Sequence, residues 1–404
     1  MTGFTYASAF AGIGGMSLGL APLGGQGVIA WEYDPTEKRR QYAQDAHKLL
    51  HPDIPVHGDI CEAVPEELPD FDVFCFTPPC QAFSVAGKRG GFEDTRGTLT
   101  FEALRIAKVK KPKILFMENV KGLVNHDKGN TMGTIIHAIN EIGYTVDFTV
   151  LNSKFFDVAQ NRERVYLIAV RDDLITAETW INAKGTTILP KAKRRYQEEG
   201  ARTFNFDWPE QTEVSTRLRD FLEDIVDDRY YLSQERTERL CKQLVNGYTP
   251  DIGGEIYRVG NTHPGGIGMS GEVYGIGGIS PTITACDYKD PKKFLDEGEV
   301  RPVLTPDRLE KCQNGRRFKD DGEEAFTLTS IDRHGVAVGE YPRYRIRKLT
   351  PRECLRLQSV PEDVTDKLQA EFSDSRLYKF AGNGLTTNVI KAIGERILTL
   401  LNGR

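Results

Sequence analysis

The chain has 404 residues, of which 39% are apolar and 27% charged, and its formal net charge at pH 7 is −5. This length predicts roughly two domains, and the composition is typical of a globular protein in water. No apolar run approaches the roughly 18 residues that span a bilayer, and residues 1–6 lack the basic region of a signal peptide, so we expect a cytoplasmic protein without a membrane partner. The seven cysteines show neither CxxC pairs nor metal-ligand spacing, which favours reduced thiols and indicates no metal site.

Short apolar runs rich in β-forming residues alternate with helical patterns through the first 170 residues. The predicted strands cover residues 6–10, 28–31, 71–76, 114–117, 145–151 and 165–170. The predicted helices between them include residues 35–50, 99–110 and 131–142. This alternation is typical of βαβ units, so we expect an α/β fold with a doubly wound, mainly parallel sheet.

A glycine-rich turn, F-A-G-I-G-G at residues 10–15, ends the first predicted strand. Its glycines allow a ligand to approach backbone N–H groups where the next helix begins. Glu32 ends the second strand, at the position where an acidic side chain commonly binds a ribose. Asp59 follows the third strand and is placed to meet an adenine amino group. Together these residues predict a nucleoside-cofactor site, with a plain tight turn as the alternative for the glycines alone.

A cysteine follows two prolines directly behind the apolar run 71–76. Pro78 and Pro79 fix φ and remove two backbone donors, so the strand ends there and Cys80 is expected on a loop. A thiol at the carboxyl end of a parallel strand suits nucleophilic attack on a ligand in the adjoining crevice. The alternative is a buried structural cysteine, which the glycine-containing segment 87–91 argues against.

Charged residues follow further strands at the same predicted edge of the sheet. Glu118 ends the run 114–117, while Arg162 and Arg164 precede the run 165–170 and share a face by the period of two. Fixed cations beside a thiol lower its pKa and bind substrate oxygens. A helix cap for Glu118 and solvated charge for the arginines are the alternatives.

The second half of the chain has a different composition. From about residue 225 to 340 it is rich in glycine, which predicts a second domain of loops and short strands. A helical pattern resumes after Pro351, and G-N-G at 382–384 leads into a final helix over about 387–401.

Basic residues gather in two places, which gives modest support for a phosphate-backbone partner. The clusters are Lys184, Lys191, Lys193, Arg194 and Arg195, and Arg343, Arg345, Arg347, Lys348, Arg352 and Arg356. For the second cluster, ion pairs with nearby acids such as Glu340 or Glu353 are the alternative.

Six motifs occur in order along the chain. They are F-A-G-I-G-G at 10–15, P-P-C-Q-A-F-S at 78–84, E-N-V at 118–120, Q-N-R-E-R-V-Y at 160–166, R-K-L-T-P-R-E-C-L-R-L-Q at 347–358 and G-N at 382–383. As a set they resemble the bacterial and phage DNA (cytosine-5) methyltransferases of the restriction–modification type, and residues 91–99 resemble the mobile loop that closes over DNA in that family. The chain departs from the family pattern at Ser8, where an acid is common, at Thr77, where glycine is usual, and at Gly384, where serine is usual.

The resemblance implies S-adenosylmethionine as cofactor, double-stranded DNA as partner, and C5 of a flipped-out cytosine as methyl acceptor through a covalent Cys80–C6 intermediate. It assigns catalytic roles to Cys80, Glu118, Arg162 and Arg164. The cofactor-binding residues it implies are Phe10, Gly12, Gly14, Gly15, Glu32, Asp59, Ile60, Pro79 and Asn383. The DNA-binding residues it implies are Ser84, Arg96 and Thr282.

The resemblance also predicts how the chain is divided. Residues 1–224 are expected to form the catalytic, cofactor-binding domain, residues 225–375 a smaller target recognition domain rich in loops and strands, and residues 376–404 a helix that returns to the catalytic domain. We expect a monomer, with any cognate restriction endonuclease acting as a separate protein.

Three alternatives remain open from the sequence. A tRNA cytosine-5 methyltransferase shares the thiol and glutamate chemistry, although the roughly 150-residue glycine-rich insertion suits duplex recognition better. An NAD-dependent oxidoreductase shares the glycine loop but leaves P-P-C and Q-N-R-E-R-V-Y unexplained. A non-catalytic DNA-binding protein needs only the basic clusters.

Overall fold

The computed structural model describes residues 3–79, 99–235 and 345–403, together with residues 280–282 and the short strands between 258 and 338. The chain divides into two compact units. The first comprises Met1–Leu151, Glu163–Glu210 and Ile390–Arg404, and the second comprises Asn152–Arg162 and Gln211–Val389. No helix in the described part of the chain is long and apolar enough to cross a membrane.

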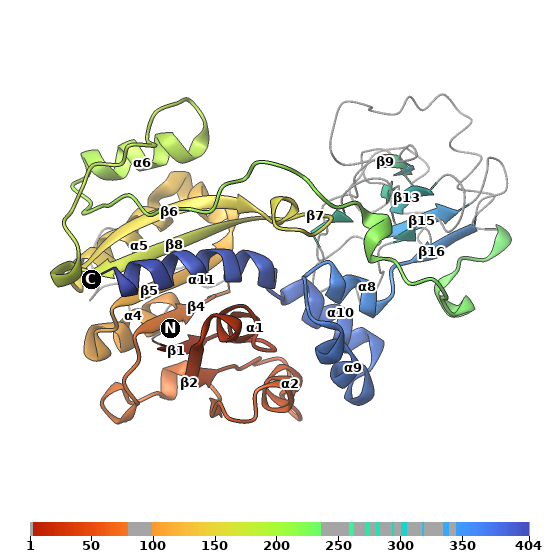
Figure 1. Ribbon diagram of the computed structural model, residues 1–404, viewed down its shortest axis with the longest axis horizontal. Helices are drawn as coiled ribbons and strands as arrows, with labels where there is room; N and C mark the ends of the chain where they lie inside the picture. The colour runs from red at the N-terminus through yellow and green to blue at the C-terminus, as the bar shows by residue number, and fades with distance from the viewer. Residues whose placement is uncertain are drawn as a thin grey trace. The chain divides into compact units, whose positions relative to one another are not determined.

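A seven-stranded sheet organises the first unit, with strand order β3-β2-β1-β4-β5-β8-β6 (Figure 1). Its strands are β1 Phe4–Ala9, β2 Gly25–Trp31, β3 Val56–His57, β4 Val73–Phe76, β5 Ile114–Val120, β6 Tyr144–Asn152 and β8 Glu163–Arg171. β1 to β5 pair in parallel with their neighbours, and β8 runs antiparallel to β5. The predicted α/β fold with a mainly parallel sheet is confirmed.

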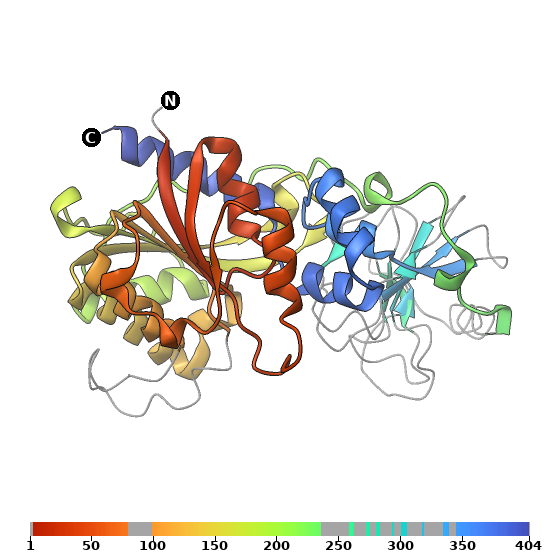
Figure 2. The same ribbon diagram turned by 90° about the horizontal axis from the view of Figure 1, so that it is seen from below.

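Helices cover both faces of this sheet. They are α1 Gly15–Leu20, α2 Tyr42–Leu50, α4 Leu99–Lys110, α5 Asn130–Glu141, α6 Ile188–Glu198 and α11 Thr387–Asn402. Figure 2 shows α11 on the same side as α1, with α4 and α5 on the opposite side. All four residues of β4 are buried, as expected for a strand covered on both faces.

One predicted helix boundary is wrong. The helix expected over residues 35–50 begins only at Tyr42. Asp34 accepts hydrogen bonds from both the backbone and the hydroxyl of Thr36, and the Gln41 side chain donates to the carbonyls of Asp34 and Glu37. These local side-chain bonds stabilise turns over residues 34–41 in place of the first helical turns.

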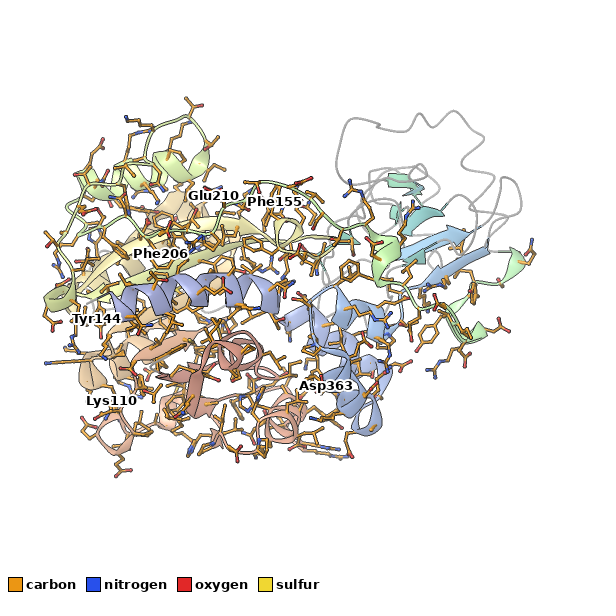
Figure 3. The ribbon with its side chains drawn as sticks, viewed as in Figure 1. Lys110, Tyr144, Phe155, Phe206, Glu210 and Asp363 are labelled. Carbon is orange, nitrogen blue, oxygen red and sulfur yellow. The ribbon has the colours of Figure 1, made fainter. Side chains whose placement is uncertain are left out.

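A buried ion pair fixes α6 to β6. Lys193 Nζ lies 2.6 Å from Asp147 Oδ1, and the two side chains are 0% and 1% exposed. The other carboxylate oxygen accepts from the backbone of Phe206, which is labelled in Figure 3, and from the indole of Trp208. Lys193 therefore belongs to the core, and its assignment to a basic surface cluster is wrong.

The second unit consists of short strands and helices. β12 Lys293–Phe294, β13 Val300–Leu304, β15 His334–Val338 and β16 Arg345–Lys348 form a closed barrel. β9 Arg258–Asn261, β10 Glu272–Tyr274 and β14 Arg317–Phe318 form a three-stranded sheet, while β7 Gln160–Asn161 pairs in parallel with β11 Ser280–Pro281. The helices are α8 Pro351–Arg356, α9 Glu362–Glu371 and α10 Asp374–Asn383.

A second buried ion pair joins β16 to α8. The Arg347 guanidinium donates to both carboxylate oxygens of Glu353 at 2.9 Å, and both side chains are fully buried. Glu353 also accepts from the Thr350 backbone and completes a capping box at the start of α8. The structural alternative for Arg347 is thus confirmed, and its assignment to a phosphate-binding cluster is wrong.

Candidate active site

The strand order of the first sheet reverses at β1, which lies between β2 and β4. In open α/β sheets ligands bind in the crevice outside the carboxyl ends of the strands at such a reversal. β1 ends at Ala9, which pairs with Trp31 of β2 and Phe76 of β4. The glycine loop follows β1, the Pro-Pro turn follows β4, and Glu118 lies on β5, so the sheet brings these three segments to one edge.

The glycine loop has an alternating left-handed backbone. Phe10, Gly12 and Gly14 have φ angles of 58°, 57° and 95°. A Cβ atom added to Gly12 would meet nothing within 4 Å, so the space outside the loop is open at this residue. Glycine is therefore favoured here by the left-handed backbone angle and not by lack of space. At Gly14 an added Cβ would lie 2.2 Å from His51 Nε2, so glycine is also required for close packing against α2.

Glu32 reaches from the end of β2 to this loop. Its Oε2 accepts from the Gly12 N–H at 2.7 Å, and the residue is half-buried. The next residue, Tyr33, is a large aromatic residue that is 48% exposed. Sequence reasoning missed Tyr33, although an aromatic residue directly after the acid at a strand end was the available signal.

Asp59 lies beyond the short strand β3. Its carboxylate accepts from the Cys61 backbone at 2.9 Å and caps a short 3₁₀ helix, in which Ile60 is buried. Partial burial, and then the Asp59 carboxylate, raises the pKa of the Cys61 thiol to about 11. Cys61 is therefore an exposed thiol that stays protonated at neutral pH.

The described part of the Pro-Pro turn is tied to β5. Asn119 Nδ2 donates to the Pro78 carbonyl at 2.9 Å in a buried contact, and Asn119 Oδ1 accepts from the Val120 backbone. Pro78 is buried and Pro79 is exposed. Cys80, Ser84 and Arg96 lie outside the described residues. The structure therefore places the turn as far as Pro79, the residue before the thiol.

Glu118 and Arg164 meet across neighbouring strands. Arg164 Nε lies 3.2 Å from Glu118 Oε1, and the side chains are 15% and 9% exposed. The antiparallel register of β5 and β8 pairs Glu118 with Tyr166 and Val120 with Arg164, which places the two charged groups diagonally at the sheet edge. A carboxylate and a guanidinium with little solvent around them form a site for a polar, planar ligand.

A family model described as C-5 cytosine-specific DNA methylase matches residues 4–399. The chain belongs to this family. It is 43% identical to the orphan methyltransferase M.SPRI of Bacillus phage SPR, over 97% of this chain and 96% of that protein. It is 30% identical to the type II methyltransferase M.HhaI of Haemophilus parahaemolyticus, over 100% of this chain and 96% of that protein.

Solved structures agree on the fold. A DNMT2 variant from Spodoptera frugiperda matches with a TM-score of 0.59 at 17% identity, covering 98% of this chain and 99% of that chain. The protein is thus a DNA (cytosine-5) methyltransferase with the fold of its family, and the predicted family, fold class and enzyme class are confirmed. Enzymes of this family use S-adenosylmethionine. A non-catalytic DNA-binding protein and an NAD-dependent oxidoreductase are both excluded.

In this methyltransferase the described partners of the Arg162 side chain differ from those of the Arg164 side chain. Arg162 lies between β7 and β8, is 3% exposed, and belongs to the second unit. Its Nη2 donates to the Gly384 carbonyl at 2.7 Å and its Nη1 to the Gly382 carbonyl at 3.5 Å. Arg162 is not part of either strand, so the period of two does not run unbroken from Arg162 to Arg164, and their common face stays a prediction.

The remaining predicted residues also lie in the second unit. Asn383 is exposed at the end of α10. Gly384 has an ordinary φ of −67°, but a Cβ added to it would lie 2.8 Å from the Phe380 carbonyl oxygen, so a larger residue here would require the backbone to shift. Thr282 is 3% exposed and donates to the Asn161 carbonyl at 2.9 Å. Its contact with DNA stays a prediction.

The residues of the carboxyl edge fit the family's cofactor. Open space outside Gly12 gives access to the loop backbone. Half-buried Glu32 and exposed Tyr33 are the two residues that directly follow β2. Carboxylates pair with ribose hydroxyls, and aromatic rings stack on adenine. No group of three or more His, Cys, Asp or Glu side chains that could hold a metal ion occurs among the described residues.

Proposed function

We propose that the chain transfers a methyl group from S-adenosylmethionine to C5 of a flipped-out cytosine in a specific duplex DNA sequence, with Cys80 as the nucleophile. The observation that carries this proposal is the common edge of the sheet. The glycine loop, the Pro-Pro turn before Cys80 and the Glu118–Arg164 pair all meet at the reversal of strand order around β1 and β4.

The cofactor is proposed to lie across the ends of β1 to β4. Backbone groups of residues 10–15 and Pro79 would surround its amino-acid part, and Glu32 would bind the ribose. Asp59 and Ile60 would contact the adenine, and the exposed ring of Tyr33 is proposed to stack on it. Asn383, in the second unit, is proposed to bind the cofactor, as the family resemblance implies. When bound, the cofactor supplies an electrophilic methyl group on a sulfonium centre.

Cytosine C5 is a poor nucleophile, which is why a thiol is needed. Addition of the Cys80 thiolate to C6, with uptake of a proton at ring N3, makes an S–C bond and converts the ring to an enamine. C5 of this enamine would take up the methyl group as the sulfonium S–CH3 bond breaks and a neutral thioether leaves, and N3 gives its proton back when the S–C6 bond later breaks. A base removes the C5 proton, and the S–C6 bond breaks to return the thiolate. The thiolate is regenerated, so no oxidant or reductant is required.

Glu118 and Arg164 are proposed to act on the base. As a carboxylic acid Glu118 donates to ring N3 and accepts from the exocyclic amine, while the Arg164 guanidinium binds O2. Their 3.2 Å contact keeps the two groups next to each other. Arg162, bonded to the Gly382 and Gly384 carbonyls, is proposed to support the site and not to touch the base.

DNA recognition is proposed to lie over residues 225–375 in the second unit, with Thr282 as a DNA contact there. Ser84 and Arg96, which belong to the first unit, are proposed as further DNA contacts. C6 of a stacked cytosine cannot be reached by a side chain, so the base must leave the duplex, at an unstacking cost of a few kcal/mol. We propose that the enzyme acts as a monomer and that any restriction endonuclease is a separate protein. These roles rest on the family motifs.

Labelled cofactor tests the proposal against the tRNA alternative, which the family model does not favour. The enzyme is incubated with S-adenosylmethionine carrying a labelled methyl group, and with unmethylated duplex DNA or tRNA at equal concentration. We expect label in 5-methylcytosine after digestion of the DNA. Label in the tRNA alone, or at cytosine N4, would overturn the proposal.

A further inference from the structure

One peptide group in the cofactor loop is held from both sides. The N–H of Ala11 donates to the Trp31 carbonyl at the end of β2, at 2.9 Å. The carbonyl of the same peptide, that of Phe10, accepts from the Thr77 hydroxyl just beyond β4, also at 2.9 Å. The orientation of this peptide is therefore set jointly by the strands that flank β1.

The held peptide begins at an unfavourable backbone conformation. Phe10 has a φ of 58°, in the left-handed region that side chains other than glycine rarely adopt. Such a conformation persists where surrounding contacts over-determine it, and it occurs most often at ligand sites. The Thr77 hydroxyl is one of these contacts, because it bonds the carbonyl whose direction follows from the φ and ψ of Phe10.

Thr77 also begins the turn that leads to the proposed nucleophile. Its N–H donates to the Ala9 carbonyl at 3.2 Å, and the next two residues, Pro78 and Pro79, have no N–H to donate. Thr77 thus provides both a backbone and a side-chain bond from the start of this turn to the end of β1. Asn119 holds the other side of the turn, through the Pro78 carbonyl.

We propose that Thr77 is a positioning residue that couples the cofactor loop to the nucleophile turn through its hydroxyl group. The proposal rests on the proposed function. Because the family pattern has glycine at this position, the coupling belongs to this chain. Without the hydroxyl, the Phe10–Ala11 peptide loses one of its two fixed partners, and cofactor binding no longer orders the residues that precede Cys80.

The variants Thr77→Val and Thr77→Ser separate the hydroxyl from the shape of the side chain. Valine keeps the branched volume and removes the donor, whereas serine keeps the donor. Thr77→Ala serves in place of valine if the extra methyl disturbs folding. Thr5→Val is the matched control, because the Thr5 hydroxyl donates to Asp72 at 3.1 Å and so joins the segments of β1 and β4 at the opposite edge of the sheet.

Calorimetric titration with S-adenosylmethionine in the absence of DNA is the first measurement. Loss of one hydrogen bond predicts that Thr77→Val raises the dissociation constant about three- to tenfold, with Thr77→Ser near the wild type. Thr5→Val is expected to lower the unfolding temperature and leave the dissociation constant unchanged. Equal affinity of Thr77→Val and wild type would overturn this inference alone. Failure of the wild type to bind S-adenosylmethionine would overturn the proposed function and this inference with it.

Thiol alkylation at Cys80, followed by peptide mass spectrometry, measures the coupling itself. Bound cofactor should change the alkylation rate of Cys80 in the wild type and in Thr77→Ser, and should change it little in Thr77→Val at saturating cofactor. Buried Cys75 serves as the unreactive reference within the same protein. An unaltered response in Thr77→Val would contradict the coupling.

Discussion

The two edges of the seven-stranded sheet are built differently. At the carboxyl edge Phe10 has a left-handed backbone, the Glu118–Arg164 pair is largely buried, and the turn after β4 is held by the Asn119 side chain from β5. At the amino edge Asp72 accepts from the Thr5 backbone and hydroxyl and from exposed Lys113, and Tyr144 donates to the Pro112 carbonyl.

The contrast shows where this chain departs from the arrangement that is easiest to fold. Contacts at the amino edge include solvated ion pairs, which is what stability alone requires. Lys111 at this edge also has a left-handed φ of 48°, but it directly follows the last residue of α4, where such a conformation commonly ends a helix. A strained residue and a charge pair with little solvent raise the free energy of the folded state unless other contacts compensate, and such features concentrate at functional sites. Substitutions at the carboxyl edge should therefore affect chemistry first, and those at the amino edge only stability.

The largest effect is expected at the nucleophile. Cys80→Ser should abolish methyl transfer, because a serine hydroxyl is far less acidic than a thiol, while the dissociation constant for S-adenosylmethionine stays near that of the wild type. Single-turnover methylation and calorimetry measure the two quantities. Cys61→Ser is the control and should remain active. A Cys80→Ser enzyme that methylates DNA at the wild-type rate would rule out the thiol mechanism.

A large but finite effect is expected at Glu118. Glu118→Gln should lower kcat on the order of 10²-fold, the usual range for general acid catalysis, with little change in cofactor affinity. Glu163→Gln is the matched control, since Glu163 lies on β8 and pairs with Lys121 at the exposed surface. If Glu118→Gln lost cofactor affinity but turned over normally at saturating cofactor, Glu118 would act on the cofactor and not on the cytosine.

Glu32 should show the opposite pattern. Glu32→Ala removes a charged hydrogen-bond partner from both the loop and the proposed ribose site, so the cofactor dissociation constant should rise about 10- to 100-fold. The rate at saturating cofactor should fall much less. Glu66→Ala, at an exposed position, is the control. An unchanged dissociation constant would remove Glu32 from the cofactor site.

Acid should destabilise the loop region through His47. Burial, and then adjacent His51, lowers the pKa of His47 to about 3, and its ring nitrogens have no hydrogen-bond partner within the described part of the chain. Because the folded-state pKa lies below the unfolded value of about 6.5, this contribution is complete above pH 6.5 and falls by about 1.4 kcal/mol per unit as pH decreases toward 3. Urea unfolding at pH 7.5, 6 and 5 should show a weaker pH dependence in His47→Leu. An identical dependence in both proteins would contradict the assignment.

The smallest effect is expected at the amino edge. Partial burial raises the pKa of Asp72, but hydrogen bonds from Lys113 and Thr5 outweigh it and hold the pKa below its usual value. This contribution is present above pH 4 and is lost as pH falls further. Lys113 is half-exposed, so Lys113→Ala should reduce the free energy of unfolding by less than about 1 kcal/mol and leave cofactor affinity unchanged. A change in cofactor affinity would contradict the claim that substitutions at the amino edge affect only stability.

Local patterns were sufficient to predict much of the fold. The helix at residues 99–110 has the predicted limits, because its periodic apolar face is followed by Pro112, which cannot continue a helix. The Pro-Pro dipeptide likewise ended β4 where expected. These features depend on neighbours in sequence, which is the information that a pattern contains.

Charged residues whose partners are distant could not be predicted in the same way. Lys193 was assigned to the surface because charges are usually solvated, yet its partner Asp147 is 46 residues away on β6. The Arg162 side chain bonds the carbonyls of Gly382 and Gly384, which lie 220 and 222 residues further along the chain and so cannot be read from a local periodicity. The ion pair of Arg347 could be considered from the sequence, since its partner Glu353 lies only six residues along the chain.

Covalent trapping tests the nucleophilic role of the carboxyl edge most directly. Duplex DNA in which 5-fluorocytosine replaces cytosine is incubated with enzyme and S-adenosylmethionine, and the products are separated under denaturing conditions. Fluorine cannot leave C5 as a proton does, so the wild type should accumulate a stable protein–DNA adduct whose peptide contains Cys80, and Cys80→Ser should form none. Wild-type enzyme that methylates ordinary DNA but gives no adduct at Cys80 would contradict the proposed chemistry.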